Sequence, residues 1–352
     1  MRIGISLLTF SPGNGGSTEV YARQLIRALA RNGTLDYAVL APEHERDGVE
    51  GLPTIQVDEP RSGAADEPRR SLLARTARRA RGAGGRIASL DVVHYALTAP
   101  IPSTDAPTVV TLHDIQHRDL PDFFGPARRS FRRIAYDRAA RSAAAVVATS
   151  EFARERALEV LELDPSRTHV VPLAVDHDVF GPGAEQAEPF ALYPARPWPH
   201  ENHARLFEAF ASLRQTRPRL RLVLTGDGHE RLGTLPEAVE SLGPVSATTL
   251  ASLYRRAACL VLPGLDEGFG LPALEAMACG CPVAAADSGA LPEICGEAAV
   301  TFDPTDVEAM ASAMVEADTR RDALRAKGFA RAAQFTWESV ARGHEEVYRS
   351  LA

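Results

Sequence analysis

The residues best suited to chemistry lie in one glycine-rich stretch, Gly264-Leu-Asp-Glu-Gly-Phe-Gly-Leu-Pro-Ala-Leu-Glu-Ala-Met-Ala-Cys-Gly-Cys-Pro-Val283. An apolar strand pattern ends before it at Leu262, whereas Pro272 and Gly280 mark the first turn and the end of a short helix. Loop amides and the N-terminus of a helix together bind anions. This stretch therefore predicts a phosphate site that follows a strand.

Two glutamates stand within the same stretch, Glu267 in the predicted loop and Glu275 in the first turns of the predicted helix. A carboxylate repels a phosphate, so we expect both glutamates to contact uncharged, hydroxyl-bearing parts of a ligand. A ligand that offers phosphates to backbone amides and hydroxyls to carboxylates is a sugar nucleotide.

These residues need a scaffold, and the sequence predicts an α/β protein with two doubly wound parallel sheets. Short apolar runs alternate with helical patterns along the chain of 352 residues, which is typical of βαβ units. The predicted strands are too many for one comfortable sheet: 3–8, 37–40, 54–57, 91–95, 108–112, 144–149, 169–171, 190–193, 220–225, 259–262, 282–286 and 299–302. A Gly/Pro-rich stretch without apolar periodicity, 180–189, predicts a linker between the two sheets.

The string EGFGLPALEAMACGCPV, in which seven residues separate Glu267 from Glu275, resembles the signature of retaining glycosyltransferases of family 4, which have the GT-B fold. The resemblance extends over nearly the whole chain, to Gly15-Gly16, His113-Asp114, Val171-Pro-Leu-Ala-Val-Asp176, Tyr193-Pro-Ala-Arg196 with Asn202, Leu222-Val-Leu-Thr-Gly-Asp-Gly228 and Phe335-Thr-Trp-Glu338. Ala174 stands where the family pattern has glycine.

The resemblance implies two Rossmann-like domains that face each other across a cleft. The N-terminal domain, residues 1–185, would bind the acceptor, and the C-terminal domain, residues 186–336, would bind the nucleotide sugar. Residues 337–352 are predicted to form a closing helix, which in the family crosses back to the first domain. The linker and this helix would be the hinge of cleft closure.

The resemblance also implies site residues. The catalytic candidates are His113, which would contact the sugar or the acceptor side, and Glu267, which would hold sugar hydroxyls; the donor-binding candidates are Gly16, Arg196, Glu201, Gly226, Val245, Phe269, Gly270, Leu271 and Glu275; and Gly15 and Asp114 are the acceptor-side candidates. His113 follows a predicted strand at the carboxyl edge, where open α/β sheets bind ligands. A histidine at a strand end that bonds only to the backbone is the alternative for this residue.

The implied reaction is a hexosyl transfer with retention of configuration, without a metal ion or another cofactor. The donor would be GDP-mannose or a UDP-sugar, and the acceptor a glycan, a lipid-linked glycan or a small molecule. Arg196 would neutralise the diphosphate with a bidentate guanidinium, and the amides of residues 269–271 would add the field of the helix end. A phosphorolytic or sucrose-type enzyme of the same fold is a second enzyme class, which no residue specifically favours.

Glu201 departs from the family pattern, because the residue five positions after the matching arginine is usually lysine. The change reverses a charge beside the expected diphosphate. We expect one of three outcomes: the loop directs Glu201 to solvent while His200 or His203 approaches the phosphates; Arg196 and the helix end suffice; or binding and activity are weakened. The third outcome makes an accessory protein that binds sugar nucleotides the alternative function.

Two further motifs resemble ligand-binding sites but are better explained by local structure. The run Gly13-Asn-Gly15-Gly16 suggests a dinucleotide fingerprint, but Thr18 stands where the third glycine belongs. Asp176-His-Asp178 imitates a metal-binding D-x-D motif, yet its position after a strand and before the linker favours a turn. We therefore predict neither a nicotinamide site nor a metal site.

Composition narrows the partners and the compartment. Residues 1–185 hold 23 Arg against 24 acidic residues and the net charge of the chain is -7, so we expect no nucleic-acid partner. No apolar run is long enough to span a membrane, the first ten residues predict a strand rather than a signal peptide, and the four cysteines fit small buried residues of a reducing compartment. We expect a cytoplasmic protein.

Two arginine-rich segments, 61–86 and 127–141, predict either solvated surface or peripheral contact with the inner face of a membrane.

Overall fold

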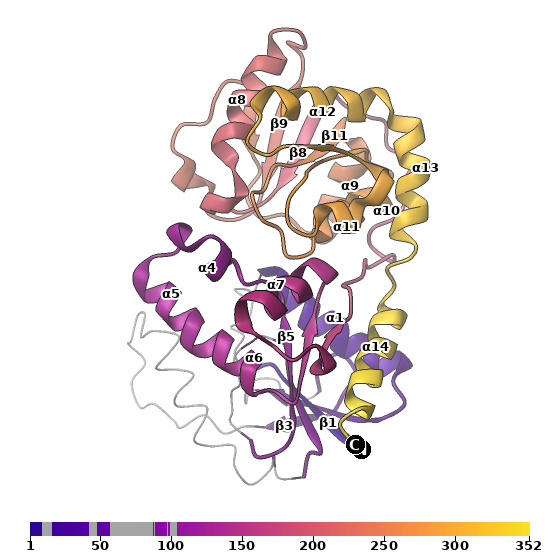
Figure 1. Cartoon of the computed structure of the whole chain (residues 1–352). Helices are drawn as coiled ribbons and strands as arrows, with labels where there is room; N and C mark the ends of the chain where they lie inside the picture. Colours follow the sequence, from indigo (N-terminus) through magenta and orange to yellow (C-terminus); the bar gives the residue numbers. More distant parts are fainter. Residues whose placement is uncertain (9–15, 42–47, 57–86, 88, 97, 99–103) are drawn as a thin grey trace, which may run out of the picture. The chain divides into compact units, whose positions relative to one another are not determined.

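The computed structural model describes residues 1–8, 16–41, 48–56, 87, 89–96, 98 and 104–352. Its contacts divide the chain into two compact units (Figure 1). The first unit comprises Met1–Pro172 together with Trp337–Ala352, and the second comprises Leu173–Thr336. The arginine-rich segment 61–86 and Gly15 lie outside the described residues.

The first unit is built on a parallel sheet of seven strands in the order β3-β2-β1-β4-β5-β6-β7. The strands are β1 (Arg2–Ser6), β2 (Asp36–Ala41), β3 (Thr54–Gln56), β4 (Val92–Tyr95), β5 (Thr108–Leu112), β6 (Ala145–Ala148) and β7 (Thr168–Val170). Strands β4, β5 and β6 consist of small and β-branched residues with few exceptions, and nearly all of their side chains are buried. That composition is typical of parallel strands covered on both faces.

The second unit has a parallel sheet of six strands in the order β10-β9-β8-β11-β12-β13. They are β8 (Phe190–Pro194), β9 (Arg221–Thr225), β10 (Val239–Ser241), β11 (Cys259–Leu262), β12 (Val283–Ala286) and β13 (Ala299–Phe302). The prediction of two parallel α/β sheets is confirmed. Strand β10 was not predicted, because it is a three-residue edge strand that contains the polar pair Glu240 and Ser241.

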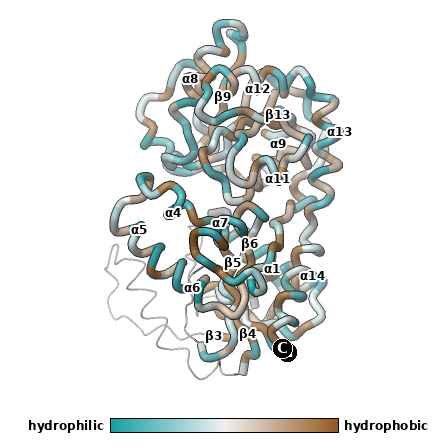
Figure 2. Tube along the Cα trace, viewed as in Figure 1, coloured by the Kyte–Doolittle hydropathy of each residue, from teal (hydrophilic) through white to brown (hydrophobic). Residues whose placement is uncertain are grey.

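The helices that cover the two sheets follow the expected α/β alternation. In the first unit they are α1 (Gly16–Asn32), α4 (Gln116–Asp119), α5 (Pro126–Arg132), α6 (Arg138–Ser142), α7 (Glu151–Leu161) and α14 (Trp337–Arg349). In the second unit they are α8 (His203–Arg214), α9 (Ala247–Arg256), α10 (Leu271–Ala278), α11 (Leu291–Cys295), α12 (Val307–Thr319) and α13 (Arg321–Ala332). Figure 2 shows apolar residues along β5 and β6 and more hydrophilic residues along outer helices such as α8.

The contact boundary between the units lies earlier in the chain than the Gly/Pro-rich stretch 180–189. The reason is that the segment after β7 already packs into the second unit: the Val175 amide donates to the carbonyl of Phe335, and the buried Phe180 ring contacts Tyr254. Asp176 and Asp178 form a turn in this segment, in which the Asp178 amide donates to the Asp176 carboxylate at 3.2 Å.

The C-terminal helix α14 packs against α1 in the first unit (Figure 1). Its Glu345 carboxylate accepts hydrogen bonds from the amides of Thr34 and Leu35 and from the Tyr37 hydroxyl, at 2.5, 3.2 and 2.5 Å. Burial alone would raise the pKa of Glu345, but these hydrogen bonds hold it below its usual value. A buried carboxylate satisfied in this way fixes the register of the helix on the unit.

Candidate functional site

The predicted donor residues gather at the carboxyl edge of the second sheet. The loop after β8 carries Arg196 and Glu201, the loop after β9 carries Gly226, and the loop after β11 runs into α10. Strands β9 and β11 are the two neighbours of β8. The Leu265 amide donates to the carbonyl of His200 at 2.8 Å, which ties the first loop to the third.

The start of α10 has the geometry of an anion site. Gly270 caps the helix in the left-handed region, with φ 92°, and Pro272 occupies the first turn. A side chain on Gly270 would be strained by this backbone conformation, so glycine is required there. The amide of Leu271, at the first position, has no carbonyl acceptor within the helix, whereas Pro272 has no amide hydrogen and the Ala273 amide donates to the carbonyl of Gly270 at 3.0 Å. The Leu271 amide is therefore the group at this helix start that suits an anion.

Glu275 lies one turn into α10 and is half-buried. It accepts a hydrogen bond from the Tyr254 hydroxyl at 3.1 Å. Burial raises the pKa of Glu275 to about 8, and the Tyr254 bond only partly offsets that effect. A carboxyl group with such a high pKa is typical of functional sites.

Tyr193 bonds to Glu201, and its pKa responds to the charge of Glu267. The Tyr193 hydroxyl lies 2.6 Å from Oε2 of Glu201, and burial, Glu201 and Glu267 together raise the pKa of Tyr193 well above its usual value. Burial also raises the pKa of Glu201 to about 6. The second unit therefore brings the predicted Glu201 carboxylate to a buried tyrosine.

The first expected outcome for Glu201 is wrong in one part, because its side chain does not point to solvent. It keeps only 20% of its surface exposed and turns inward to Tyr193. The neighbouring Asn202 adopts φ 61° and donates to the carbonyls of Pro263 and Pro304, at 2.9 and 2.8 Å. These bonds hold the loop in the conformation that turns Glu201 inward.

The remaining predicted donor residues stand on the same loops. Gly226 adopts φ 133°, and a Cβ there would lie 2.8 Å from the carbonyl oxygen of Ala195. This close approach keeps the β9 loop against the β8 loop that carries Arg196. Val245 is half-buried before α9, and Phe269 is buried beside Phe335.

In the first unit, His113 follows β5 as predicted. The Nε2 of His113 lies 3.0 Å from the carbonyl of Ala96, so this nitrogen carries the hydrogen. Burial lowers the pKa of His113, which leaves Nδ1 unprotonated at neutral pH. The residue therefore bonds to the backbone, as the alternative predicted, and its Nδ1 can act as a hydrogen-bond acceptor. Gly16 begins α1.

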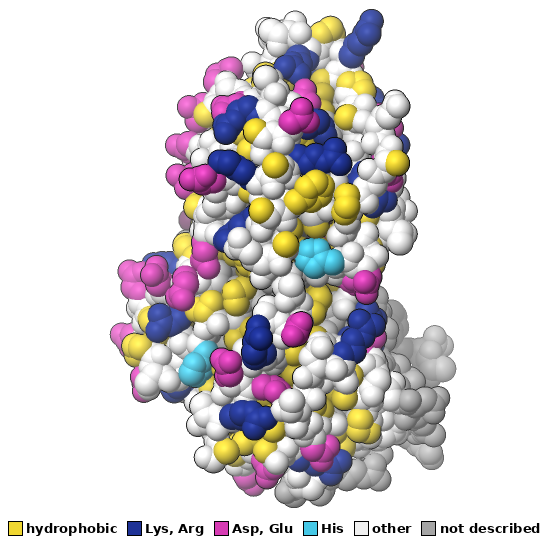
Figure 3. All heavy atoms as spheres, turned by 90° about the vertical axis from the view of Figure 1, so that its right-hand side faces the viewer, with side chains coloured by type: hydrophobic (Ala, Val, Ile, Leu, Met, Phe, Trp, Pro, Cys, Tyr) yellow, Lys and Arg dark blue, Asp and Glu magenta, His cyan; other side chains and the backbone are white. Residues whose placement is uncertain are grey.

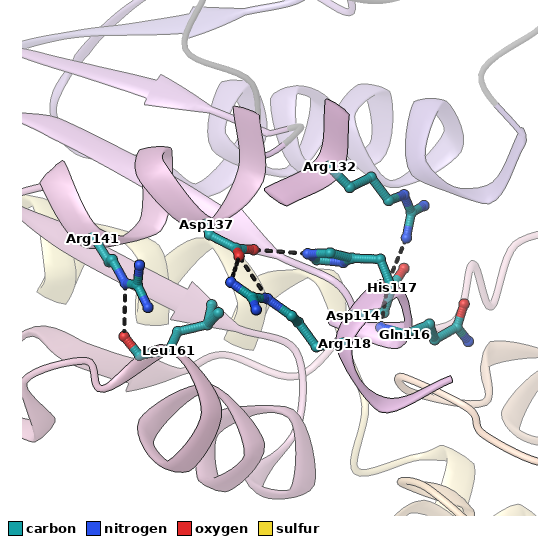
Figure 4. Close-up of polar contacts among 8 residues, drawn as sticks. All are labelled: Asp114, Gln116, His117, Arg118, Arg132, Asp137, Arg141 and Leu161. Atoms are coloured by element: carbon teal, nitrogen blue, oxygen red, sulfur yellow. Dashed lines mark hydrogen bonds and ion pairs between the residues drawn. The ribbon is translucent and has the colours of Figure 1, made fainter. Parts of the chain in front are cut away.

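Asp114 belongs to a polar cluster at α4, α5 and α6 (Figure 4). It accepts from Nη1 of Arg132 at 2.9 Å and from the Gln116 amide at 3.1 Å. The buried Asp137 accepts from Nε2 of His117 at 2.7 Å and from Arg118. Burial would raise the pKa of Asp137, but the His117 and Arg118 bonds hold it below its usual value.

The arginine-rich stretch 127–141 is not one regular helix. A π-helical turn, Arg133–Asp137, separates α5 from α6. The turn leaves Ile134 69% exposed while Asp137 is buried. A hollow of about 360 Å³ opens here, lined by Arg118, Ser130, Arg133, Ile134 and Arg141. Sequence periodicity could not reveal this wider turn.

His203 is a buried histidine whose ring lies near Tyr193. It begins α8, is 5% exposed, and neither ring nitrogen has a hydrogen-bond partner among the described residues. Its ring lies 4.9 Å from that of Tyr193. Burial and then His229 lower the pKa of His203 to about 4. Its place directly after Asn202 was the only signal in the sequence.

The described residues hold neither a metal-ligand cluster nor a membrane span. No group of three or more His, Cys, Asp and Glu side chains there could hold a metal ion. None of the helices in this part of the chain has the length and apolar character needed to cross a bilayer. All four cysteines are free and buried. On the face drawn in Figure 3, basic and acidic side chains are interspersed.

Two family models match the chain in succession. A model described as Glycosyltransferase Family 4 matches residues 15–179, and one described as Glycosyl transferases group 1 matches residues 188–318. Among curated proteins, O-antigen chain mannosyltransferase B of Escherichia coli is 29% identical over 74% of this chain and 75% of that protein. A D-inositol 3-phosphate glycosyltransferase of Segniliparus rotundus is 30% identical over 58% of this chain, but only 52% of its own length is matched.

Solved structures agree in fold. Sucrose-phosphate synthase from Thermosynechococcus elongatus has a TM-score of 0.81 and 22% identity, covering 100% of this chain and 99% of that chain. HepE of Anabaena, solved in complex with UDP and glucose, has a TM-score of 0.73 and 19% identity, covering 99% and 100%. At these identities the likeness concerns the fold, which is GT-B.

Proposed function

This chain belongs to glycosyltransferase family 4, and from that premise we propose that it transfers a hexose from a nucleotide-diphosphate sugar to a hydroxyl of its acceptor. The transfer proceeds with retention of configuration and without a metal ion. The donor is GDP-mannose or a UDP-sugar, and the acceptor is a glycan, a lipid-linked glycan or a small molecule. The relatives named above include a mannosyltransferase, and one structural neighbour was solved with UDP.

One observation carries the proposal: the start of α10, Glu275 and Arg196 share the carboxyl edge of one sheet. The α10 amides suit the diphosphate and Arg196 adds a guanidinium. Glu275 binds the ribose hydroxyls, because its buried carboxyl group needs partners that carry no negative charge. Glu267 binds the sugar hydroxyls. Arg196 and the start of α10 would neutralise the diphosphate in place of a metal ion.

In the proposed step, the acceptor oxygen forms a bond to the anomeric carbon while the bond from that carbon to the diphosphate oxygen breaks on the same face. The acceptor proton passes to the departing diphosphate oxygen. Arg196 and the α10 amides stabilise the negative charge that develops there. His113 contacts the sugar or the acceptor side through its unprotonated Nδ1.

Glu201 keeps a second function open, that of an accessory protein which binds sugar nucleotides and transfers slowly or not at all. The observation that favours it is the inward carboxyl group of Glu201, held at Tyr193 where the family has a lysine. This group adds negative charge near the expected diphosphate as pH rises above its pKa of about 6. Nucleotide binding is common to both functions, and turnover distinguishes them.

The hollow of Arg118, Ser130, Arg133, Ile134 and Arg141 supports peripheral contact with an anionic membrane. An exposed isoleucine beside arginines suits the boundary between headgroups and acyl chains. A lipid-linked acceptor would be reached from that surface.

The deciding experiment is a thermal-shift panel with UDP, GDP, TDP and ADP and their sugars, followed by donor hydrolysis and transfer assays. A ligand at about 100 times its dissociation constant stabilises the protein by about 2.7 kcal/mol, which a thermal shift detects. We expect one nucleotide to stabilise the protein and its hexose derivative to be consumed. If no nucleotide stabilises the protein, both functions are wrong; stabilisation without consumption supports the accessory function.

A further inference from the structure

Five buried polar side chains form one hydrogen-bonded chain in the first unit. They come from four elements: Tyr21 on α1, His94 on β4, Thr111 on β5, and His344 and Tyr348 on α14. Each is at most 2% exposed. The Tyr348 hydroxyl lies 2.7 Å from Nδ1 of His94, whose Nε2 lies 2.8 Å from Oγ1 of Thr111. The Tyr21 hydroxyl lies 3.1 Å from the same Oγ1 and 3.0 Å from Nε2 of His344.

The direction of every hydrogen in this chain follows from one carbonyl group. Nδ1 of His344 lies 2.8 Å from the carbonyl of Val340, which can only accept, so this nitrogen carries the hydrogen. Burial lowers the pKa of His344 to about 4. The ring is therefore neutral at pH 7, and its Nε2 accepts from the Tyr21 hydroxyl.

The remaining donors are then assigned in turn. The oxygen of Tyr21 has given its hydrogen to His344, so it accepts from Thr111. The oxygen of Thr111 accepts from Nε2 of His94. Burial lowers the pKa of His94 well below its usual value, so this ring is also neutral and its Nδ1 accepts from Tyr348. The chain begins and ends on α14, and each group has one role.

Tyr21 is also the neighbour of His113. The two rings meet edge to face, with centroids 4.9 Å apart and an interplanar angle of 82°. The His113 ring also bonds to the carbonyl of Ala96 through Nε2. The Tyr21 ring therefore limits rotation of His113, and its own hydroxyl is held by α14 through His344.

We propose that Tyr21 is a positioning residue for His113 and that the C-terminal helix α14 sets its position through the chain of His344, Tyr21, Thr111, His94 and Tyr348. The helix thereby keeps the His113 imidazole in the orientation that donates from Nε2 and leaves Nδ1 unprotonated. For catalysis, this inference rests on the proposed function of His113 in hexosyl transfer. For the orientation of the ring, it stands on the geometry alone.

The test is NMR of the full-length protein with ¹³C- and ¹⁵N-labelled histidine, in which His113→Asn assigns the His113 signals. Tyr21→Phe removes one hydroxyl and keeps the ring; His344→Leu removes the acceptor; His344→Gln restores an acceptor oxygen. We expect Tyr21→Phe and His344→Leu to shift the His113 ring signals and its titration, and His344→Gln to return both toward the native values. The same two variants should lower kcat about tenfold with nucleotide affinity unchanged.

Tyr37→Phe is the matched control. It also removes a buried hydroxyl that bonds to α14, but through Glu345 and outside the chain. We expect it to lower the melting temperature and to leave the His113 signals in place. If Tyr21→Phe and His344→Leu fold with unchanged His113 signals, or if Tyr37→Phe shifts those signals equally, the positioning role is wrong. If the signals shift but His113→Asn retains full transfer, the proposed function of His113 fails while the coupling stands.

Discussion

The two units bury their ionisable side chains in opposite ways. In the first unit, His94 and His344 are neutral, and every ring nitrogen of the pair has a partner within the unit. In the second unit, Glu201 and Glu275 have raised pKa values, and both ring nitrogens of His203 lack a partner in the part of the chain that the structure describes. The network around His94 and His344 is complete, although Nδ1 of His117 in the same unit also lacks a partner among the described residues, whereas the group around Tyr193 and His203 is incomplete.

The difference indicates where a ligand belongs. A complete buried network stabilises one packing arrangement, whereas an unsatisfied buried group costs free energy that a ligand can recover. Perturbed carboxyl groups beside a helix N-terminus are a functional-site signal. We infer that the second unit recognises the donor and that the first unit orients groups for the transfer.

The largest expected effects separate the two glutamates of the second unit. Glu267→Ala should lower turnover on the order of a hundredfold and leave nucleoside diphosphate affinity within about twofold, because its partners are sugar hydroxyls. Glu275→Ala should weaken that affinity about ten- to a hundredfold, since it removes a hydrogen-bond acceptor for the ribose. Calorimetric titration and initial rates measure the two effects.

The exposed Glu237, in the same unit, provides a control through Glu237→Ala. It should change neither quantity. An equal loss of nucleoside diphosphate affinity in both glutamate variants would contradict the division of roles. Unchanged affinity in both would show that the nucleotide does not bind at α10.

Sequence reasoning found the elements better than the side-chain partners. Every predicted strand is present, because a buried parallel strand needs a continuous apolar run that the sequence displays. The string that contains Glu267 and Glu275 predicted the loop and the short helix α10 for a similar reason, since loop and helix are contiguous. The His94–Tyr348 bond joins residues 254 positions apart, and no spacing rule reveals such a pair.

The inward position of Glu201 was beyond the sequence for a related reason. It depends on the left-handed conformation of Asn202 and on the Tyr193 hydroxyl, which belongs to the preceding strand. Comparison with the family pattern gives only the change of charge from lysine to glutamate. The sequence thus singled out this position by its departure from the family pattern but could not give the direction of its side chain.

The second expected effect tests this carboxyl group. Glu201→Lys should tighten nucleoside diphosphate binding about tenfold, equivalent to about 1.4 kcal/mol, and should raise the transfer rate by a similar factor. Glu201→Gln removes the charge but keeps an acceptor for Tyr193, so about half of that free energy, roughly threefold, is expected. Titration with UDP and GDP at pH 7.5 decides the matter. Unchanged affinity in both variants would show that this position does not face the phosphates.

The third expected effect concerns the surface of the first unit. Arg133→Ser and Arg141→Ser should each weaken co-sedimentation with anionic vesicles about fivefold at low salt, since a basic residue near such a surface contributes about 1 kcal/mol. High salt should abolish the difference. Arg320→Ser, at the residue between α12 and α13 where the arginine pairs with Glu316, is the control. Equal vesicle binding by all variants would leave these arginines as solvated surface.

The smallest expected effect is a pH dependence of stability, in which Glu275 and His203 of the second unit act in different pH ranges. Glu275 has a raised pKa of about 8 in the folded state, so its contribution to stability is present below pH 4.5 and is lost as pH rises toward 8. His203 behaves oppositely, because its lowered pKa of about 4 costs stability only as pH falls below 6.5. Between pH 6.5 and 8 the change therefore belongs chiefly to Glu275.

Glu275→Gln imitates the protonated carboxyl group and should remove this dependence. We expect the melting temperature of the variant, relative to that of the native protein, to rise by several degrees between pH 6.5 and 8, corresponding to about 2 kcal/mol. Glu346→Gln on the exposed face of α14 should show no such trend. A parallel pH dependence of the native protein and Glu275→Gln would mean that Glu275 is ionised when unliganded. The contrast between the completed His94–His344 network of the first unit and the unsatisfied groups of the second unit would then rest on Glu201 and His203 alone.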